Sequence, residues 1–323
     1  MPLISFEKIT TARDRIKRYT VITPLRKSRY LSDLVDGDVY LKLENEQVTG
    51  SFKARGAFNR LFTLSPDELA AGIITASTGN HGLGVSLAAR ELGIKATVVY
   101  PINASHEKLE KMTEAGADVI QAVGFEEVEP YARNLAKEKG MIYVSPYNDP
   151  EIVAGAGTTG LEIIEQIDDI DIVIIPVGGG GLISGIALAI KTKAPHTMII
   201  GVQSEASPEV YESWKAGHWV EAHESDSIAQ GLMGGVESDS ITLDIIREYV
   251  DKMILVSESS ILDAMKILYE KERLKVEGAG AVSFAAFIKC ATDFKGKRVV
   301  IVVSGGNIGE EEFRSLLSRS SPS

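Results

Sequence analysis

Lys53 is the side chain of this sequence best suited to covalent chemistry. It lies in the stretch 49–57, Thr-Gly-Ser-Phe-Lys-Ala-Arg-Gly-Ala, which predicts the first turn of a helix around the lysine. A helix N-terminus carries partial positive charge, so it disfavours the ammonium form and favours the neutral, nucleophilic amine. Such a lysine can form a Schiff base with a carbonyl compound. The alternative is an ordinary surface lysine behind a Gly50-Ser51 helix cap.

A polar loop at 77–82 follows the strand-like run that ends at Ala76. It reads Ser-Thr-Gly-Asn-His-Gly and leads directly into a predicted helix at 83–92. Backbone N–H groups at a helix start bind anions such as a carboxylate. Helix capping by Ser77 or Thr78 is the alternative, but it would explain one polar residue of this loop and not four.

A run of four glycines at 178–181 precedes a predicted helix at 183–191. Glycines have no Cβ, so successive N–H groups can converge on a phosphate at the helix N-terminus. The competing interpretation is a dinucleotide-binding fingerprint, Gly-x-Gly-x-x-Ser at 179–184 with Glu205 beyond the next strand, but its third glycine is missing. A P-loop is disfavoured because neither Lys-Ser nor Lys-Thr follows the glycines.

A third loop, Ser304-Gly305-Gly306-Asn307, follows the last strand-like run, and a plain glycine-rich turn is its alternative interpretation. Strand-like apolar runs alternate with helical patterns along the chain. The predicted strands are 39–43, 72–76, 96–100, 118–121, 172–177, 198–202, 253–256 and 298–303. This order predicts an α/β fold with a mainly parallel sheet. Ligands of such sheets bind at the carboxyl ends of the strands, where the three loops lie.

The composition favours a protein that acts on small molecules. The 323 residues carry a formal net charge of -11, with a pI near 5.1, which argues against a surface that binds nucleic-acid phosphates. The sequence has no apolar run long enough to span a bilayer, and its first residues lack the pattern of a signal peptide. We therefore expect a cytoplasmic protein without nucleic-acid or membrane partners.

Taken in order, these motifs resemble those of the threonine dehydratase and serine racemase family, which are pyridoxal-phosphate enzymes of fold type II. The resemblance extends from Thr23-Pro24-Leu25 through the segments 50–53, 77–82, 178–182, 277–281 and 304–307. It implies an α/β fold like that of the tryptophan synthase β subunit, with two open, twisted, mainly parallel sheets flanked by helices. A large cofactor-binding domain would comprise 1–66 and 150–323, and a small mobile domain that closes on the substrate would comprise 67–149.

The resemblance implies a role for each motif. Lys53 would hold pyridoxal 5'-phosphate through a Schiff base and then act as the base at the substrate Cα, with Ser77 and Thr78 as further catalytic residues. The implied cofactor-binding residues are Phe52, Lys53, Asn80, Gly178, Gly179, Gly180, Gly181, Leu182 and Ser304. The implied substrate-binding residues are Ser77, Thr78, Asn80 and His81, around the substrate carboxylate.

The resemblance also implies a reaction. Ser304 would face the pyridine nitrogen, and a neutral hydroxyl cannot hold that nitrogen protonated as a carboxylate would. This favours prompt loss of a β-substituent, so we expect β-elimination from a β-hydroxy amino acid: L-threonine to 2-oxobutanoate and ammonia, and L-serine to pyruvate. The alternatives are a serine racemase, a dehydratase for 3-hydroxyaspartate or another β-hydroxy amino acid, and a non-catalytic amino-acid sensor. A sensor would be expected to lack Lys53.

A bound cation is left open by the resemblance. Relatives that bind a divalent metal commonly carry an acid at the position of Gln203, with further ligands at those of Ser207 and Glu209. Glutamine is a weaker, uncharged ligand. A divalent or monovalent cation at these residues is therefore only a hypothesis. For the assembly, the family expectation is a homodimer or homotetramer.

Overall fold

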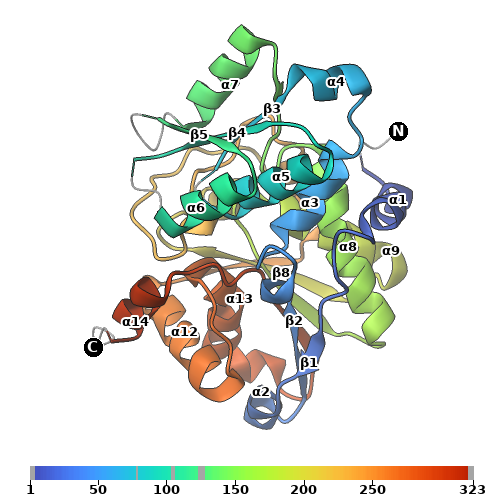
Figure 1. Ribbon diagram of the computed structural model, residues 1–323. Helices are drawn as coiled ribbons and strands as arrows, with labels where there is room; N and C mark the ends of the chain where they lie inside the picture. The colour runs from blue at the N-terminus through green and yellow to red at the C-terminus, as the bar shows by residue number, and fades with distance from the viewer. Residues whose placement is uncertain (1–3, 78, 103–105, 123–127, 319–323) are drawn as a thin grey trace.

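The chain forms two mainly parallel sheets that are flanked by helices (Figure 1). The computed structural model describes residues 4–77, 79–102, 106–122 and 128–318. Within these residues the large sheet has the strand order β1-β2-β10-β7-β8-β9, and the small sheet has the order β5-β4-β3-β6. The predicted α/β fold with two mainly parallel sheets is confirmed. The domain boundaries stay a prediction.

The described strands are β1 (Leu25–Lys27), β2 (Asp38–Leu43), β3 (Ile73–Ala76), β4 (Ala96–Tyr100), β5 (Asp118–Gln121), β6 (Ile142–Tyr143), β7 (Ile172–Pro176), β8 (Met198–Ser204), β9 (Lys252–Val256) and β10 (Arg298–Val303). The described α-helices are α1 (Phe6–Ile16), α2 (Arg29–Val35), α3 (Lys53–Leu61), α4 (Pro66–Ala71), α5 (Asn80–Glu91), α6 (His106–Glu114), α7 (Val128–Lys139), α8 (Pro150–Gln166), α9 (Gly181–Lys193), α10 (Glu209–Ala216), α11 (Ile241–Tyr249), α12 (Glu258–Glu272), α13 (Gly278–Lys289) and α14 (Glu310–Ser318). Short 3-10 turns are η1 (Glu44–Glu46), η2 (Gln230–Leu232) and η3 (Ala291–Phe294).

Every predicted strand is present, with ends shifted by at most two residues. The strands β1 and β6 were not predicted, because segments of three and two residues carry too little alternation to be recognised. Both predicted helices next to the loops begin earlier than expected. The helix expected at 83–92 starts at Asn80, and the one expected at 183–191 starts at Gly181.

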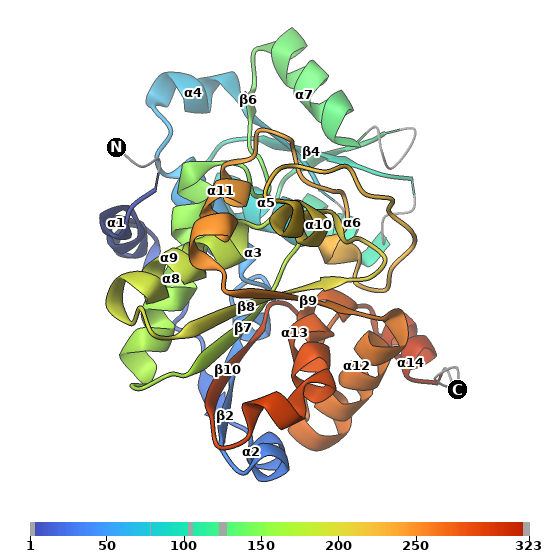
Figure 2. The same ribbon diagram turned by 180° about the vertical axis from the view of Figure 1, so that it is seen from behind.

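The central strands of the large sheet, β10 and β7, are apolar except for Arg298 at the start of β10, as expected where helices cover both faces. Along β10, Val299, Ile301 and Val303 pack in one core cluster with α13 side chains, among them Phe284. The alternate residues Val300 and Val302 pack in a second cluster with α9 side chains. The side chains therefore alternate between two cores, and Figure 2 shows α13 and α9 on opposite faces of this sheet.

The small sheet is built in the same way on a smaller scale. Ile73 of β3 and Val98 of β4 pack with residues of α3 and α5. Their neighbours Ile74 and Val99 pack with Ala132 and other residues of α7. Helix α3 thus packs into the core of the small sheet. Its first residues, however, lie next to the end of β10 in the large sheet.

The start of α3 is fixed at the carboxyl end of β10. The backbone N–H of Phe52 donates to the carbonyl oxygen of Ser304 at 3.1 Å, and Ser51 forms an isolated antiparallel bridge with Gly305. The strands β10 and β2 run parallel from Arg298 to Val303, so they end together at this point. The lysine at the helix start is therefore held at the ligand-binding edge of the sheet.

A buried network of charged side chains ties α3 to β2 and α8. The Arg55 side chain is 1% exposed and donates to Glu44 at 2.7 Å and to Glu162 at 2.6 Å. Lys42 Nζ, also buried, donates to Glu162 at 2.6 Å. Burial alone would raise the pKa of Glu162, but the charges of Arg55 and Lys42 and their hydrogen bonds lower it overall. Opposite charges thus compensate one another inside the core.

Among the residues that the structure describes, no helix is long and apolar enough to cross a membrane.

We expect the Arg55→Met variant to lose about 3 to 5 kcal/mol of unfolding free energy, because two buried carboxylates would be left facing one lysine. Urea unfolding followed by circular dichroism measures this loss. The matched control is Arg13→Met, which removes an exposed ion pair with Glu165 and should cost less than about 1 kcal/mol. Equal losses in the two variants would contradict a stabilising role for the buried network.

Candidate active site

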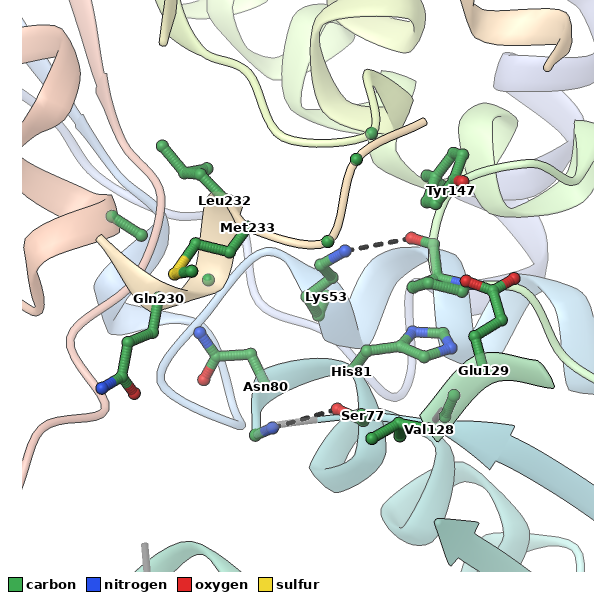
Figure 3. Close-up of a pocket in the computed structure, with 18 of the residues that line it drawn as sticks. Lys53, Ser77, Asn80, His81, Val128, Glu129, Tyr147, Gln230, Leu232 and Met233 are labelled. Carbon is green, nitrogen blue, oxygen red and sulfur yellow. Dashed lines mark hydrogen bonds between the residues drawn. The ribbon is translucent and has the colours of Figure 1, made fainter. Parts of the chain in front are cut away.

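A cavity of about 770 Å³ is lined by residues of both sheets at the carboxyl ends of their strands. Figure 3 shows Lys53, Asn80, His81, Tyr147 and Leu232 around it. The predicted site residues that line it are Phe52, Lys53, Ser77, Asn80, His81, Gly179, Ser304 and the metal candidate Glu209. The predicted Gly178, Gly180, Gly181, Leu182, Gln203 and Ser207 are not among its lining residues. Folding therefore brings together motifs that lie far apart in the sequence. Thr78 lies outside the described residues.

Lys53 is the first residue of α3, as predicted. Phe52 is the helix N-cap and makes no side-chain capping bond, so the Gly50-Ser51 cap is not found. Lys53 Nζ donates to the carbonyl oxygen of Pro146 at 3.0 Å and lies 5.1 Å from the centre of the Phe52 ring. Burial lowers the pKa of Lys53 to about 8, against an opposing effect of the Glu277 charge. A large fraction of this amine is therefore neutral near pH 8.

The polar loop before α5 combines a capping role with a binding surface. Ser77 Oγ accepts hydrogen bonds from the backbone N–H groups of Gly79 at 3.0 Å and Gly82 at 2.8 Å, which is what the capping alternative predicted for this residue. Asn80 and His81 form the first turn of α5, and both side chains line the cavity. Capping therefore accounts for Ser77, but not for Asn80 and His81, whose side chains line the cavity.

His81 is a neutral residue of the site. Its side chain is buried, and Nε2 lies 3.3 Å from the carbonyl oxygen of Val144. Burial and the nearby Lys53 charge lower the pKa of His81 to about 3. Since a carbonyl can only accept, the neutral ring carries its proton on Nε2. Nδ1 is buried without a hydrogen-bond partner among the described residues.

The glycine loop before α9 has no room for side chains. A Cβ on Gly179 would lie 2.4 Å from the Tyr147 ring, and one on Gly178 would lie 3.1 Å from the backbone of Leu232. Gly180 has a φ of 88°, which favours glycine. Thr242 Oγ1 holds the loop by donating to the Gly179 carbonyl at 2.7 Å. The loop thus presents backbone to the cavity at the start of a helix.

The dinucleotide-binding interpretation finds no support at Glu205. This residue would have to approach a ligand bound at the glycine loop. Instead its carboxylate lies 3.9 Å from Lys289 Nζ at an exposed position, and it does not line the cavity.

Ser304 provides an uncharged hydroxyl at the end of β10. Its side chain is buried, lines the cavity and donates a long hydrogen bond of 3.4 Å to the Ala279 carbonyl. The sequence predicted a neutral hydroxyl at the end of the last strand, and Ser304 places one in the cavity.

Sequence reasoning missed the charged cavity residues Lys108, Glu129, Glu221, Glu224 and Glu277, of which Glu277 and Lys108 contact predicted site residues. Glu277 precedes α13, where a carboxylate predicts a simple helix cap, but it makes no capping bond and instead accepts from Asn80 Nδ2 at 2.5 Å. Burial raises the pKa of Glu277. Lys108 lies on α6, and a Cβ on Gly79 would be 2.8 Å from its Cδ. The glycine at 79 was the available signal, since it leaves room for that side chain.

The three candidate metal ligands bind protein groups. Gln203 Oε1 accepts from the backbone N–H of Tyr211 at 2.6 Å, and Glu209 Oε1 accepts from that of Val236 at 2.9 Å. Ser207 Oγ donates to Glu224. In the described part of the chain, no group of three or more His, Cys, Asp or Glu residues is arranged to hold a metal ion. The cation therefore stays a hypothesis.

Comparison with known proteins finds one enzyme family and relatives with the same named activity. The family model described as pyridoxal-phosphate dependent enzyme matches residues 16–305. An L-threonine ammonia-lyase of Thermotoga maritima is 42% identical over 307 residues, which cover 95% of this chain and 76% of the relative. A catabolic L-threonine dehydratase of Staphylococcus aureus is 45% identical over 311 residues, covering 95% and 90%.

Solved structures with the same fold include a racemase and a deaminase. Maize serine racemase has a TM-score of 0.90 and 33% identity, covering 97% of this chain and 96% of that one. The processed form of threonine deaminase isoform 2 from Solanum lycopersicum also has a TM-score of 0.90, with 34% identity and coverage of 96% and 86%.

We expect Lys53 to react with amine-directed reagents at a rate that rises with pH and levels off above about pH 8, because the lowered pKa leaves the amine neutral there. The measurement is time-dependent trinitrophenylation of the cofactor-free protein from pH 6 to 10, with Lys53 quantified by peptide mass spectrometry. The exposed Lys95 in the same digests is the internal reference. A Lys53 rate that keeps rising tenfold per pH unit up to pH 10 would refute the lowered pKa.

Gly179→Ala should weaken binding of pyridoxal phosphate by more than about tenfold, because the added methyl must displace the Tyr147 ring or the loop. Equilibrium dialysis gives the dissociation constant. The double variant Gly179→Ala/Tyr147→Ala has space for the methyl and should regain part of the affinity. If Gly179→Ala alone binds as tightly as the unmodified chain, the loop is not the phosphate cradle.

Proposed function

The chain belongs to the pyridoxal-phosphate dependent enzyme family, and we propose that it is a lyase that converts L-threonine to 2-oxobutanoate and ammonia and L-serine to pyruvate. The observation that carries the proposal is a lysine of lowered pKa in one cavity with a glycine loop at a helix start and an uncharged serine at a strand end. The relatives named as threonine ammonia-lyase and threonine dehydratase support the choice of substrate.

The residues of the cavity fit the family's cofactor. The glycine loop is a cradle that a Cβ at residue 179 would fill, and the N-terminus of α9 offers backbone N–H groups to a phosphate. Lys53 supplies the amine, and Ser304 supplies a neutral hydroxyl. When bound, pyridoxal phosphate withdraws electrons from the substrate Cα and so makes loss of the Cα proton feasible.

The chain's own residues then have separable tasks. Lys53 Nζ, held by the Pro146 carbonyl, takes the proton from the substrate Cα. Asn80 and His81, in the first turn of α5, line the cavity at a helix N-terminus, which suits the substrate carboxylate. Because His81 stays neutral, it adds no second cation that would compete with Lys53 for that carboxylate. The Cα proton and the β-hydroxyl together make up the water that is lost, and hydrolysis of the resulting enamine gives the 2-oxo acid and ammonia.

The charges around the cavity favour a substrate with a small, uncharged side chain. The acids that line it are Glu129, Glu209, Glu221, Glu224 and Glu277, against the lysines Lys53 and Lys108. Val128, beside Glu129, is apolar. A second carboxylate, as in 3-hydroxyaspartate, would meet an excess of negative charge. Threonine and serine carry no such group.

Serine racemisation is the second candidate, because maize serine racemase shares the fold over nearly the whole chain. It requires a further proton donor at the substrate Cα, for which the sequence offered Thr78, outside the described residues. A non-catalytic sensor is disfavoured by the retained, activated Lys53. The proposal places the enzyme in the cytoplasm as a homodimer or homotetramer, supported by the family resemblance.

We expect the cofactor-loaded protein to form 2-oxobutanoate and ammonia from L-threonine, to form pyruvate from L-serine, and to leave 3-hydroxyaspartate unchanged. Lys53→Ala should lower turnover by more than about 10³-fold, since the base and the cofactor anchor are lost together. Lactate dehydrogenase coupling measures the 2-oxo acids, and chiral chromatography measures D-serine. D-serine without 2-oxo acid would favour the racemase, and no product from any substrate would refute both activities.

A further inference from the structure

The Asn80 side chain is held by two residues that belong to the other sheet. Asn80 starts α5 beside the small sheet, whereas Glu277 precedes α13 and Asn307 follows β10. Asn80 Nδ2 donates to Glu277 Oε1 at 2.5 Å, and Asn80 Oδ1 accepts from Asn307 Nδ2 at 2.7 Å. Both ends of one amide are therefore bound across the interface between the sheets.

These partners allow only one orientation of the amide. Asn307 Nδ2 also donates to the carbonyl oxygen of Thr49 at 2.7 Å, so its own amide is fixed with the nitrogen towards Asn80. A carboxylate such as Glu277 can accept but cannot donate. The carbonyl of Asn80 must therefore face Asn307, and its nitrogen must face Glu277. The second N–H group on that nitrogen is not used by Glu277, and the Asn80 side chain lines the cavity.

The neighbouring loops keep space for both partners. A Cβ on Gly305 would lie 2.2 Å from Glu277 Oε1, and a Cβ on Gly50 would lie 2.5 Å from Asn307 Oδ1. Gly50 also has a φ of 74°, a conformation that side chains rarely adopt. Gly305 and Gly50, one from each of two predicted motifs, therefore leave the space that the side chains of Glu277 and Asn307 occupy.

The Glu277 carboxylate is buried among charges that partly compensate it. The charges that face it are those of Lys108, Glu312 and Lys53, and Lys108 and Lys53 favour its ionised form. The short bond from Asn80 favours that form as well. Burial opposes the ionised form and raises the pKa of Glu277. The carboxyl oxygen Oε1 accepts the Asn80 N–H at 2.5 Å, and the bond is strongest when the group is ionised.

We propose that Glu277 and Asn307 are positioning residues, which orient Asn80 as a fixed hydrogen-bond donor to the ring oxygen of the bound cofactor. The inference rests on the proposed function in one respect, the contact between Asn80 and pyridoxal phosphate. The donor is set before the cofactor arrives, so no side-chain ordering is left for the binding step. The contact also spans the two sheets, so their relative position determines where the donor lies.

The test is a set of cofactor dissociation constants, measured by equilibrium dialysis without any substrate. Glu277→Gln and Asn307→Ala should each weaken binding of pyridoxal phosphate by about tenfold, the effect of one strong hydrogen bond. In an Asn80→Ala background neither change should weaken it further, because both act through Asn80. The absorption maximum of the bound cofactor should shift in the same variants.

Two control variants lose comparable contacts away from the cavity. Glu258→Gln alters a carboxylate that accepts from Ser204 at 2.6 Å and from the backbone of Ile228 at 2.7 Å. Asn59→Ala removes an amide that donates to the Glu151 carbonyl at 2.7 Å. Neither residue lines the cavity, so cofactor affinity should stay unchanged in both.

A swapped pair separates the orientation of Asn80 from its simple presence. In Asn80→Asp/Glu277→Gln the new amide donates to the new carboxylate, and Asn307 still donates to it. The contact between the sheets is therefore kept, but no donor faces the cavity. Hydrogen exchange in the first turn of α5 of the cofactor-free protein should stay as slow as in the unmodified chain. Cofactor affinity should fall to that of Asn80→Ala.

The results decide the proposal independently of the reaction. Penalties that add fully in the Asn80→Ala background would overturn it, as would a Glu277→Gln variant that behaves like Glu258→Gln. Tight cofactor binding by the swapped pair would also overturn it. None of these measurements uses turnover, so a protein that binds the cofactor as expected but fails to dehydrate threonine would refute the proposed reaction alone.

Discussion

The position of α3 is the constraint on which the rest of the site depends. Its first residue is the reactive lysine, its N-terminal neighbours are bonded to the end of β10, and its third residue is the buried Arg55. The guanidinium joins Glu44, next to β2, to Glu162 on α8. A shift of this helix by one turn would move the lysine out of the cavity. It would also separate the buried Arg55 from both carboxylates and leave Glu162 with Lys42 as its remaining partner.

Glycines transmit that constraint from α3 to the glycine loop. A Cβ on Gly155 of α8 would lie 2.4 Å from the carbonyl oxygen of Arg55, and one on Gly185 of α9 would lie 2.4 Å from that of Val153. The backbones of α3, α8 and α9 therefore touch in series. The amine at the start of α3 and the N–H groups at the start of α9 are held in one rigid stack of helices.

The electrostatics of the cavity follow from burial. Desolvation lowers the pKa of Lys53 to about 8 and, with the Lys53 charge, that of His81 to about 3, while Glu277 is raised. Each shift moves its group towards the neutral form. At these three residues the shifts weaken the ion pairs that the amine or the carboxylate of a bound amino acid could form with the side chains.

Local periodicity and residue type were enough to predict the strands with long apolar runs, the reactive Lys53 and the glycine loop. The roles of Asn80 and Ser304 were predicted from the resemblance of the ordered motifs to the family. Only the tertiary structure decided the short strands β1 and β6, the early start of α5 and the partners of Arg55. It also decided that Glu277 and Asn307 meet Asn80, although 197 and 227 residues separate them from it. A glutamate before a helix or an asparagine after glycines looks like an ordinary cap or turn residue. The partner of such a residue depends on how the two sheets pack against each other, and local sequence patterns do not encode that packing.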